Sequence, residues 1–287
     1  MLRLVLLILT LTTLLPTLAQ AYDILILQSR HDTGYEDVMS GFRQRTSSRR
    51  VIVLSDYVDV DAVRIVREDH PKLILAIGDA ALKLARKVQN TPIIAVMTLG
   101  IGAQSNITGI TMFAPPERYC NLLHLMKARR VGVIHNPEKT GWYMRQARQA
   151  AEKADIELVV CEVSSSRDTL THLSSLSGKI DALWMLPDVS AVTRETTEAY
   201  FRFGQDQSIP VISFAGSYLG MGAAAVIEIN YSGLGRQAGD MATALLAGNS
   251  VADVPTGYPR STTYKTNPVV LKRLGRLFDD VKQLSPH

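Results

Sequence analysis

The chain has 287 residues, of which 46% are hydrophobic and 20% are charged, and its formal net charge is +4. This length suits two lobes of ordinary size better than one small domain, and the apolar content excludes an intrinsically disordered protein. Basic residues gather between Arg43 and Arg50, but no aromatic residues alternate with them. We therefore expect no nucleic-acid partner.

The first 21 residues predict a secretory signal peptide. Arg3 precedes an apolar run over residues 4–15, and Ala19-Gln20-Ala21 fits the small-x-small cleavage pattern. The run is too short to be a comfortable membrane anchor, and no cysteine lies near the cleavage point for a lipid anchor. We expect a soluble, periplasmic mature protein that starts at Tyr22 and is not lipid-anchored.

From Asp23 the hydrophobic pattern alternates between short apolar runs, typical of buried strands, and segments with helical spacing. Asp79 is placed to cap one of these helices. This alternation predicts parallel strands joined by right-handed crossovers. The first part of the chain predicts strands at 23–29, 51–56, 72–78 and 92–97 and helices at 34–45, 60–69 and 79–89.

The same alternation then starts again. Strands are expected at 130–136, 157–163, 181–188, 210–215 and 225–231, and helices at 119–128, 142–154, 168–176, 193–207 and 234–248. The tail at 262–275 predicts one more strand and a final helix. The fold class is therefore α/β, with two Rossmann-like lobes that each contain a parallel sheet.

A repeat supports the division into two lobes. TPIIAVMTLGIGA at 91–103 and IPVISFAGSYLGMGA at 209–223 each run from a proline through apolar residues to Leu-Gly-x-Gly-Ala. In parallel sheets the ligand crevice lies at the carboxyl ends of the strands, where glycine lets backbone approach a bound molecule. Gly100–Gly102 and Gly220–Gly222 therefore line a crevice or simply make tight turns.

Motifs for cofactors, metals and hydrolysis are weak. The G-x-G-x-x-A patterns that start at Gly220 and Gly233 lack the context of a dinucleotide site and fit a turn and a helix start better. Ser217 lies one position off a nucleophile elbow. No histidine has metal-ligand spacing, although His31 and His135, each after the first strand of its lobe, face the crevice or solvent. We expect no cofactor, no metal and no enzyme activity.

Two other residue types have alternative interpretations. Cys120 and Cys161 are two buried thiols or, in an oxidising compartment, a disulfide. Trp184, inside an apolar run, is expected in a core.

Polar and aromatic residues follow the predicted strands of both lobes at positions that would meet in the crevice. Hydroxyl and N–H groups there suit a carboxylate, Asp188 suits an ammonium group, and Trp142 or Tyr218 suits an apolar side chain. The candidate ligand-binding residues are Ser29, Arg30, Tyr35, Gly78, Asp79 and Thr98 in the first lobe and Asn136, Thr140, Trp142, Asp188, Ser217 and Tyr218 in the second.

Residues from Asp23 to about Gly275 resemble the ABC-type substrate-binding family, whose members include aromatic amino acid binders. The resemblance runs through KLILAIGDAALKLA, NITGI, RRVGVIHNPEKT, WMLPD, IPVISFAG and YSGLGRQAGDMATALLAG, in that order. It implies a type I periplasmic binding protein fold whose lobes are joined by three crossings. Lobe 1 would comprise residues 22–111 and 231–253, and lobe 2 residues 112–230 and 254–287.

The resemblance implies the receptor of an ABC importer, a monomer that binds a small molecule such as an amino acid or another carboxylate between closing lobes and presents it to a membrane permease. The same lobes would suit a periplasmic ligand sensor that signals to a membrane sensor kinase or cyclase. An extracytoplasmic enzyme on a Rossmann-like scaffold is a further alternative. Family members often carry Gly-Thr-Pro where this chain has Gly78-Asp79-Ala80.

Overall fold

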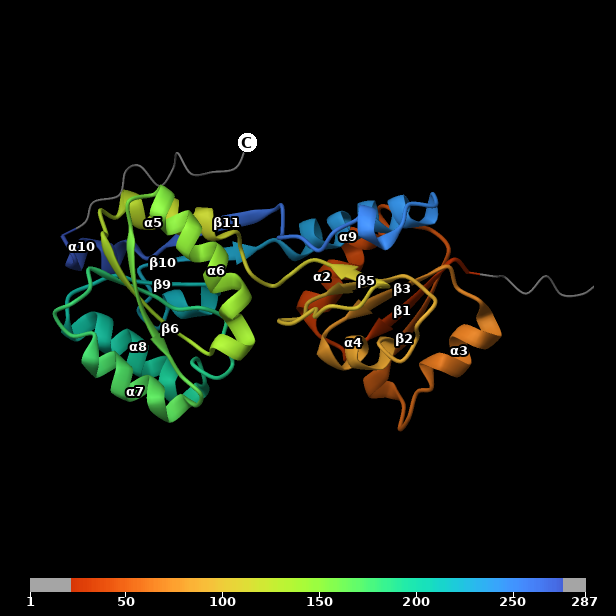
Figure 1. The fold of residues 1–287 in the computed structure, drawn as a ribbon, viewed down its shortest axis with the longest axis horizontal. Helices are drawn as coiled ribbons and strands as arrows, with labels where there is room; N and C mark the ends of the chain where they lie inside the picture. The colour runs from red at the N-terminus through yellow and green to blue at the C-terminus, as the bar shows by residue number, and fades with distance from the viewer. Residues whose placement is uncertain (1–21, 276–287) are drawn as a thin grey trace, which may run out of the picture.

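A computed structural model describes residues 22–275, which form two α/β lobes side by side, joined along one side (Figure 1). The predicted signal peptide lies outside the described residues. In both lobes a sheet is covered by helices on its two faces, as the alternating pattern of the sequence predicts.

Lobe 1 contains a five-stranded parallel sheet with the order β2-β1-β3-β4-β5. Every residue of β1 and of β3 is buried, which explains why these strands are continuous apolar runs. The elements are β1 (Ile24–Gln28), α2 (Thr33–Arg43), β2 (Arg49–Val53), the 3-10 helix η1 (Leu54–Asp56), α3 (Ala62–Asp69), β3 (Leu73–Ile77), α4 (Asp79–Ala85), β4 (Ile93–Val96) and β5 (Ile107–Gly109).

Lobe 2 contains a six-stranded sheet with the order β11-β10-β9-β8-β6-β7. Its edge strand β11 runs antiparallel to β10, while the other pairs are parallel. The elements are α5 (Pro116–Leu125), β6 (Arg130–His135), α6 (Pro137–Lys153), β7 (Glu157–Glu162), α7 (Ser166–Ser175), β8 (Ala182–Trp184), α8 (Arg194–Asp206), β9 (Val211–Ser213), the 3-10 helix η2 (Gly216–Leu219), β10 (Ala225–Ile229), β11 (Thr262–Thr266) and α10 (Pro268–Arg273).

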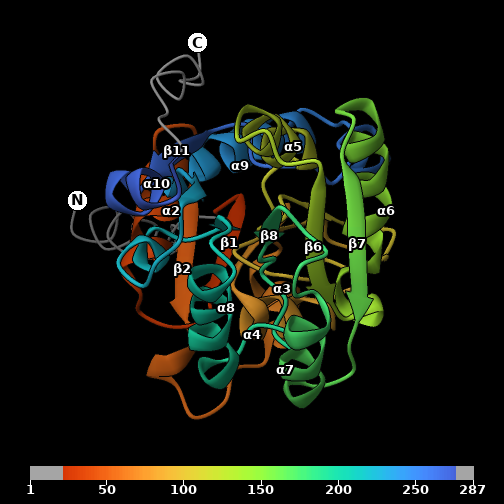
Figure 2. The same ribbon diagram turned by 90° about the vertical axis from the view of Figure 1, so that its left-hand side faces the viewer.

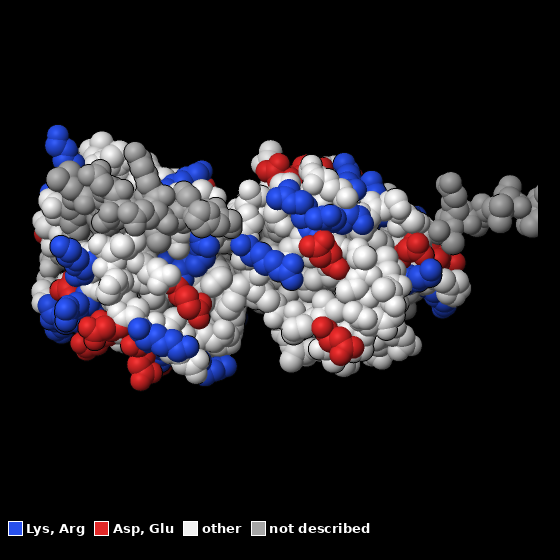
Figure 3. Space-filling model, turned by 90° about the horizontal axis from the view of Figure 1, so that it is seen from above, with Lys and Arg blue, Asp and Glu red and all other residues white. Residues whose placement is uncertain are grey.

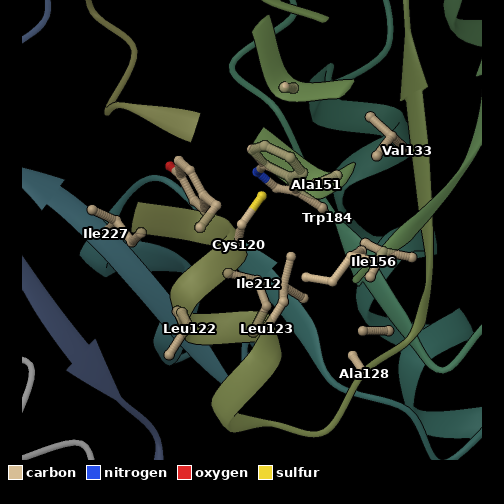
Figure 4. Close-up of a cluster of buried hydrophobic side chains, with 14 of the residues drawn as sticks. Cys120, Leu122, Leu123, Ala128, Val133, Ala151, Ile156, Trp184, Ile212 and Ile227 are labelled. Atoms are coloured by element: carbon tan, nitrogen blue, oxygen red, sulfur yellow. The ribbon is translucent and has the colours of Figure 1, made fainter. Parts of the chain in front are cut away.

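The core of lobe 2 is divided by its sheet. Side chains alternate along β6, so Val133 packs with α5 and α6 while Ile134 packs with α7 and α8; Figure 2 shows α6 beside β7, with α7 and α8 in a separate group. Trp184 is fully buried, as expected from its place in an apolar run. It lies near Cys120 in the cluster on the α5 and α6 side of the sheet (Figure 4). Cys120 is buried and Cys161 half-buried, and both are free thiols in the described structure.

Some boundaries differ from those the sequence predicts. Strand β5 was not predicted, because it is only three residues long and follows a polar segment. Helix α6 begins at Pro137 instead of Trp142, since Asn136 caps it and accepts from the Glu138 N–H (2.9 Å). Strand β8 ends at Trp184, so the residues up to Asp188 lie beyond the sheet.

The chain passes between the lobes three times. The first passage follows β5, the second leads from β10 into α9 (Tyr231–Leu246), and the third leads from the 3-10 helix η3 (Val251–Asp253) to β11. Backbone hydrogen bonds tie the passages together, from Thr111 N–H to Gly257 O and from Asn230 N–H to Ser261 O, both 3.0 Å. Because β5 and β10 both leave their sheets at the carboxyl end, the carboxyl ends of the two parallel sheets face each other.

Helix α9 packs on α2 in lobe 1 (Figure 1). The two backbones approach so closely that a Cβ on Gly41 would lie 1.9 Å from Ser232 O, and one on Gly235 would lie 2.0 Å from Val38 O. Gly235 of YSGLGRQAG therefore serves helix packing, which supports the helix interpretation of this motif over a dinucleotide site. The exact lobe boundaries given above stay a prediction.

Candidate ligand-binding site

Three of the candidate residues meet at the carboxyl edge of lobe 1. The Ser29 hydroxyl donates to Ile77 O and accepts from the Ala81 N–H, both at 3.0 Å, which ties the ends of β1 and β3 to α4. Gly78 has φ +90°, and a Cβ there would lie 2.4 Å from the Tyr35 hydroxyl and 2.6 Å from Ser29 Oγ. Glycine at this position is required by conformation and by space.

Tyr35 and Arg30 lie together at this edge. The Arg30 guanidinium carbon is 5.4 Å from the centre of the Tyr35 ring, and Arg30 pairs with Asp32 at 3.1 Å. Asp32 also caps α2 by accepting from the Gly34 N–H at 3.0 Å. Tyr35 is only 7% exposed, and this burial raises its pKa, so the phenol is neutral beside the Arg30–Asp32 ion pair.

Two other candidates in lobe 1 have different surroundings. Asp79 does not cap α4, contrary to the prediction, because Gly78 occupies the capping position and Asp79 is the first helical residue, with an exposed side chain. Thr98 follows β4 but is only 1% exposed. A ligand in the gap does not reach its hydroxyl in this conformation.

In lobe 2 a polar network joins three candidates. Oδ2 of Asp188 accepts from the Asn136 N–H (2.8 Å) and the Thr140 hydroxyl (2.7 Å), and Oδ1 accepts from the N–H groups of Ser190 (2.9 Å) and Ala191 (3.2 Å). Asp188 is 1% exposed. An ammonium-binding role does not fit this carboxylate, since its acceptor sites are filled; it fixes the loop after β8 to the start of α6.

His135 extends the network and is buried, so the interpretation as a solvated turn residue is wrong. Its Nδ1 lies 3.0 Å from Thr140 Oγ1. Because the Thr140 hydroxyl donates to Asp188, Nδ1 of His135 is the donor in this contact. Burial lowers the pKa of His135, although the negative charges of Asp188 and Glu162 oppose that effect. A neutral His135 thus completes a satisfied network.

A cavity of about 580 Å³ opens between the lobes beside these edges. Ser217, on η2, lines it, and the neighbouring Tyr218 packs edge-on against Phe214 with ring centres 5.3 Å apart. The lining also includes residues that the sequence did not single out: Asp37, Phe214, Glu228, Asn230, Tyr231 and Ser232.

Tyr231 connects this cavity to the lobe 1 edge. A Cβ on Gly34, next to Tyr35, would lie 3.1 Å from the Tyr231 ring. No local motif marks Tyr231, because its neighbours belong to α2, about 200 residues away in the chain.

Glu228, across the cavity in lobe 2, pairs with Lys265 at 2.5 Å. Acidic and basic side chains are interspersed on the face formed by the lobe connections (Figure 3).

Trp142 lies at the lobe connections. Its ring contacts Phe113 edge-on at 5.2 Å and stacks on Tyr258 at 6.3 Å, two residues of the first and third passages. The Tyr258 hydroxyl donates to Gln146 Oε1 at 2.8 Å. This aromatic group anchors the passages to α6.

The repeated glycines make turns. Gly102 has φ +67° with Arg86 beside it, and Gly222 has φ +118° with Phe201 beside it, each neighbour belonging to the same lobe as its glycine. Both segments follow the carboxyl ends of strands, β4 and β9.

The family model described as ABC transporter substrate binding protein matches residues 31–282. The chain belongs to this family. The type I periplasmic binding protein fold that its sequence predicts agrees with the two lobes, the parallel-dominated sheets and the solved structures to which it is similar.

Three similar proteins illustrate the relationship. A curated tyrosine-binding protein of Clostridioides difficile is 28% identical over 184 residues, which is 63% of this chain and 51% of that protein; the match thus spans about half the relative's length. A ligand-free, open substrate-binding protein with adhesive properties from Clostridium difficile has a TM-score of 0.69 at 22% identity, covering 90% of this chain and 96% of the other. An ABC domain in complex with L-Trp from Streptococcus pneumonia has a TM-score of 0.63 at 17% identity, covering 91% and 97%.

Two further properties apply to residues 22–275. None of their helices combines the length and hydropathy that crossing a bilayer requires. These residues also contain no group of three or more His, Cys, Asp or Glu side chains suited to a metal ion.

Proposed function

We propose that this protein is the extracytoplasmic receptor of an ABC importer and binds an amino acid or a similar small molecule between its lobes. The observation that carries this proposal is the arrangement of two parallel sheets whose carboxyl ends face each other across a gap, with the chain crossing three times beside it. Membership of the substrate-binding family supports the class of function, and the relatives that bind tyrosine and L-Trp support the ligand class.

We assign ligand contacts to side chains at the facing edges of the two lobes. In lobe 1 these are Ser29 and Tyr35, and in lobe 2 they are Ser217 and Tyr218. Gly78 is left out because it is buried and its N–H already donates to Val96 O at 2.9 Å. Hydroxyl groups suit the polar end of an amino acid, and the rings of Tyr35 and Tyr218 suit an apolar or aromatic side chain. The network around Asp188 positions the lobe 2 edge without touching the ligand.

Closure follows from this placement. A ligand that contacts both edges makes its full set of contacts only when the lobes meet, so binding shifts the population toward a closed form. A dissociation constant of about 1 μM corresponds to about 8 kcal/mol, which several hydrogen bonds and one buried side chain supply. The closed form would then be the species that a membrane permease recognises.

The decisive test is ligand binding by the purified mature protein. Native mass spectrometry identifies a retained ligand, and calorimetry with L-tyrosine and L-tryptophan measures affinity, with L-lysine as the contrasting ligand. Tyr35→Phe and Ser217→Ala should each weaken binding by about tenfold, the effect of losing one hydrogen bond. Ser174→Ala, on α7, is the matched control. If no amino acid binds, or if both site variants bind as the control does, the proposal is wrong.

A further inference from the structure

The loop between β4 and β5 starts in a conformation that its residues do not favour. Met97, the first residue after β4, has φ +57°. A non-glycine residue in this left-handed region is uncommon, and the surrounding structure must hold it there. The other four non-glycine residues with positive φ in residues 22–275 each follow a helix, whereas Met97 follows a strand. Strained residues cluster at binding sites and switch segments, so the next two residues are of interest.

Thr98 adds a second unfavourable feature to the strained backbone at Met97. Its side chain is 1% exposed, and within the described structure its hydroxyl has no hydrogen-bond partner. A buried hydroxyl without a partner is unfavourable, because it has given up water without a replacement. Any rearrangement that provides a partner for this hydroxyl therefore gains free energy.

Leu99 links the loop to the other lobe. Its half-buried side chain packs against the lobe 2 cluster that contains Phe113 and Tyr143. In Figure 1 the loop after β4 projects from lobe 1 toward α6. This apolar contact joins the loop after β4 to the lobe 2 cluster, which includes Phe113 of the first passage.

The loop has space to move up to Gly100, but it is fixed to lobe 1 at Ile101. A Cβ on Gly100 would meet no atom within 4 Å, so this residue has open space around it. Beyond it, Ile101 is buried against lobe 1, and its carbonyl accepts from the Arg86 guanidinium. Residues 97–100 can therefore change conformation while Ile101 stays anchored to α4.

We propose that residues 97–100 form a latch that holds the lobes open. Leu99 stabilises the open form through its contact with lobe 2, and this contact maintains the strained Met97 and the unsatisfied Thr98. When the lobes close, Leu99 leaves this position, the loop relaxes, and the Thr98 hydroxyl obtains a partner. This inference rests on the lobe closure of the proposed function, but it concerns the ligand-free equilibrium and does not depend on which ligand binds.

The latch predicts opposite effects for its two key residues. Leu99→Ala removes the open-state contact and should shift the ligand-free protein toward the closed form. The apparent dissociation constant should then fall by about three- to tenfold, because the closed-competent fraction rises. Thr98→Val removes the hydroxyl that closure satisfies, so it should leave the open form intact and weaken binding by about three- to tenfold. Leu99→Met keeps the apolar contact and is the matched control.

Small-angle X-ray scattering of the ligand-free mature variants, followed by calorimetry with L-tyrosine and L-tryptophan, tests the latch. A smaller radius of gyration for Leu99→Ala than for wild type and Leu99→Met is the expected result. Equal radii for all three proteins would overturn the latch whether or not a ligand binds, as would tighter binding by Thr98→Val. Absence of binding to wild type would instead contradict the ligand class, leaving the scattering result to decide the latch.

Discussion

The Thr140 hydroxyl donates a 2.7 Å hydrogen bond to Oδ2 of Asp188 inside lobe 2, where both residues are almost fully buried. The same oxygen accepts from the Asn136 N–H. One carboxylate thus connects the first turn of α6 with the loop after β8. The network holds the carboxyl edge of lobe 2 in place, so its removal should lower the free energy of unfolding.

Asp188→Asn should lower the free energy of unfolding by about 1–3 kcal/mol, because an amide NH₂ then faces donor groups and leaves them unsatisfied. Urea unfolding followed by circular dichroism measures the change. Asp206→Asn, an exposed residue of α8, is the control and should differ from wild type by less than about 0.5 kcal/mol. Equal midpoints for the two variants would show that the network does not stabilise lobe 2.

Gly78→Ala should destabilise the protein by about 1–3 kcal/mol, because φ +90° disfavours any side chain and a Cβ would collide with the Tyr35 hydroxyl. Adding Tyr35→Phe should recover only the part due to the collision with the Tyr35 hydroxyl, because Ser29 Oγ stays 2.6 Å from the new Cβ. The matched control is Gly100→Ala, where a Cβ has open space. Thermal unfolding of the three variants distinguishes these contributions; a Gly78→Ala midpoint as high as that of Gly100→Ala would contradict them.

The pH dependence of stability should include a contribution from His135. Burial lowers the pKa of this histidine in the folded protein below 6.5, while its pKa in the unfolded chain is about 6.5. The unfolded state therefore binds more protons below that pH, so the contribution is present above about pH 6.5 and is lost as the pH falls through the folded pKa.

His135→Gln should flatten this part of the curve. Urea unfolding between about pH 5 and pH 8 measures it, with His124→Gln on the exposed side of α5 as the control that keeps the slope. Asp188, Glu162 and Arg148 also act on His135, so its replacement is compared at constant ionic strength. An unchanged slope in His135→Gln would assign the pH dependence to other groups.

Gly235→Ala should be among the most damaging single-methyl additions, because the new Cβ would meet the α2 backbone at 2.0 Å. A shift of α9 away from α2 is the only relief, and we expect a loss of about 3 kcal/mol. Gly141→Ala, also in a helix but with its nearest neighbours 4.0 Å away, should instead stabilise by about 0.5–1 kcal/mol. Chemical unfolding of both variants gives the comparison, and similar midpoints would refute close packing of the two helices.

Local patterns were sufficient to predict most strands and helices. Strand β1 is apolar up to Gln28, and strand β3 is apolar throughout and is followed by Gly78. Their length and composition therefore identify both as buried strands. Strand β5 was not predicted because three residues are too few to show a hydrophobic pattern. Its pairing with β4 defines it as a strand. The antiparallel direction of β11 is likewise a matter of pairing and not of sequence period.

Hydrophobic periodicity and turn residues act over a few neighbours, so they were enough to predict the two α/β lobes, the buried Trp184 and the residue types at the strand ends. The contacts of those strand-end residues depend on the folded chain: Ser29, Tyr35 and Gly78 meet at one edge, while Thr140 donates to Asp188 inside lobe 2. No local pattern predicts these contacts, because burial and hydrogen-bond saturation depend on groups that are brought together from distant parts of the chain.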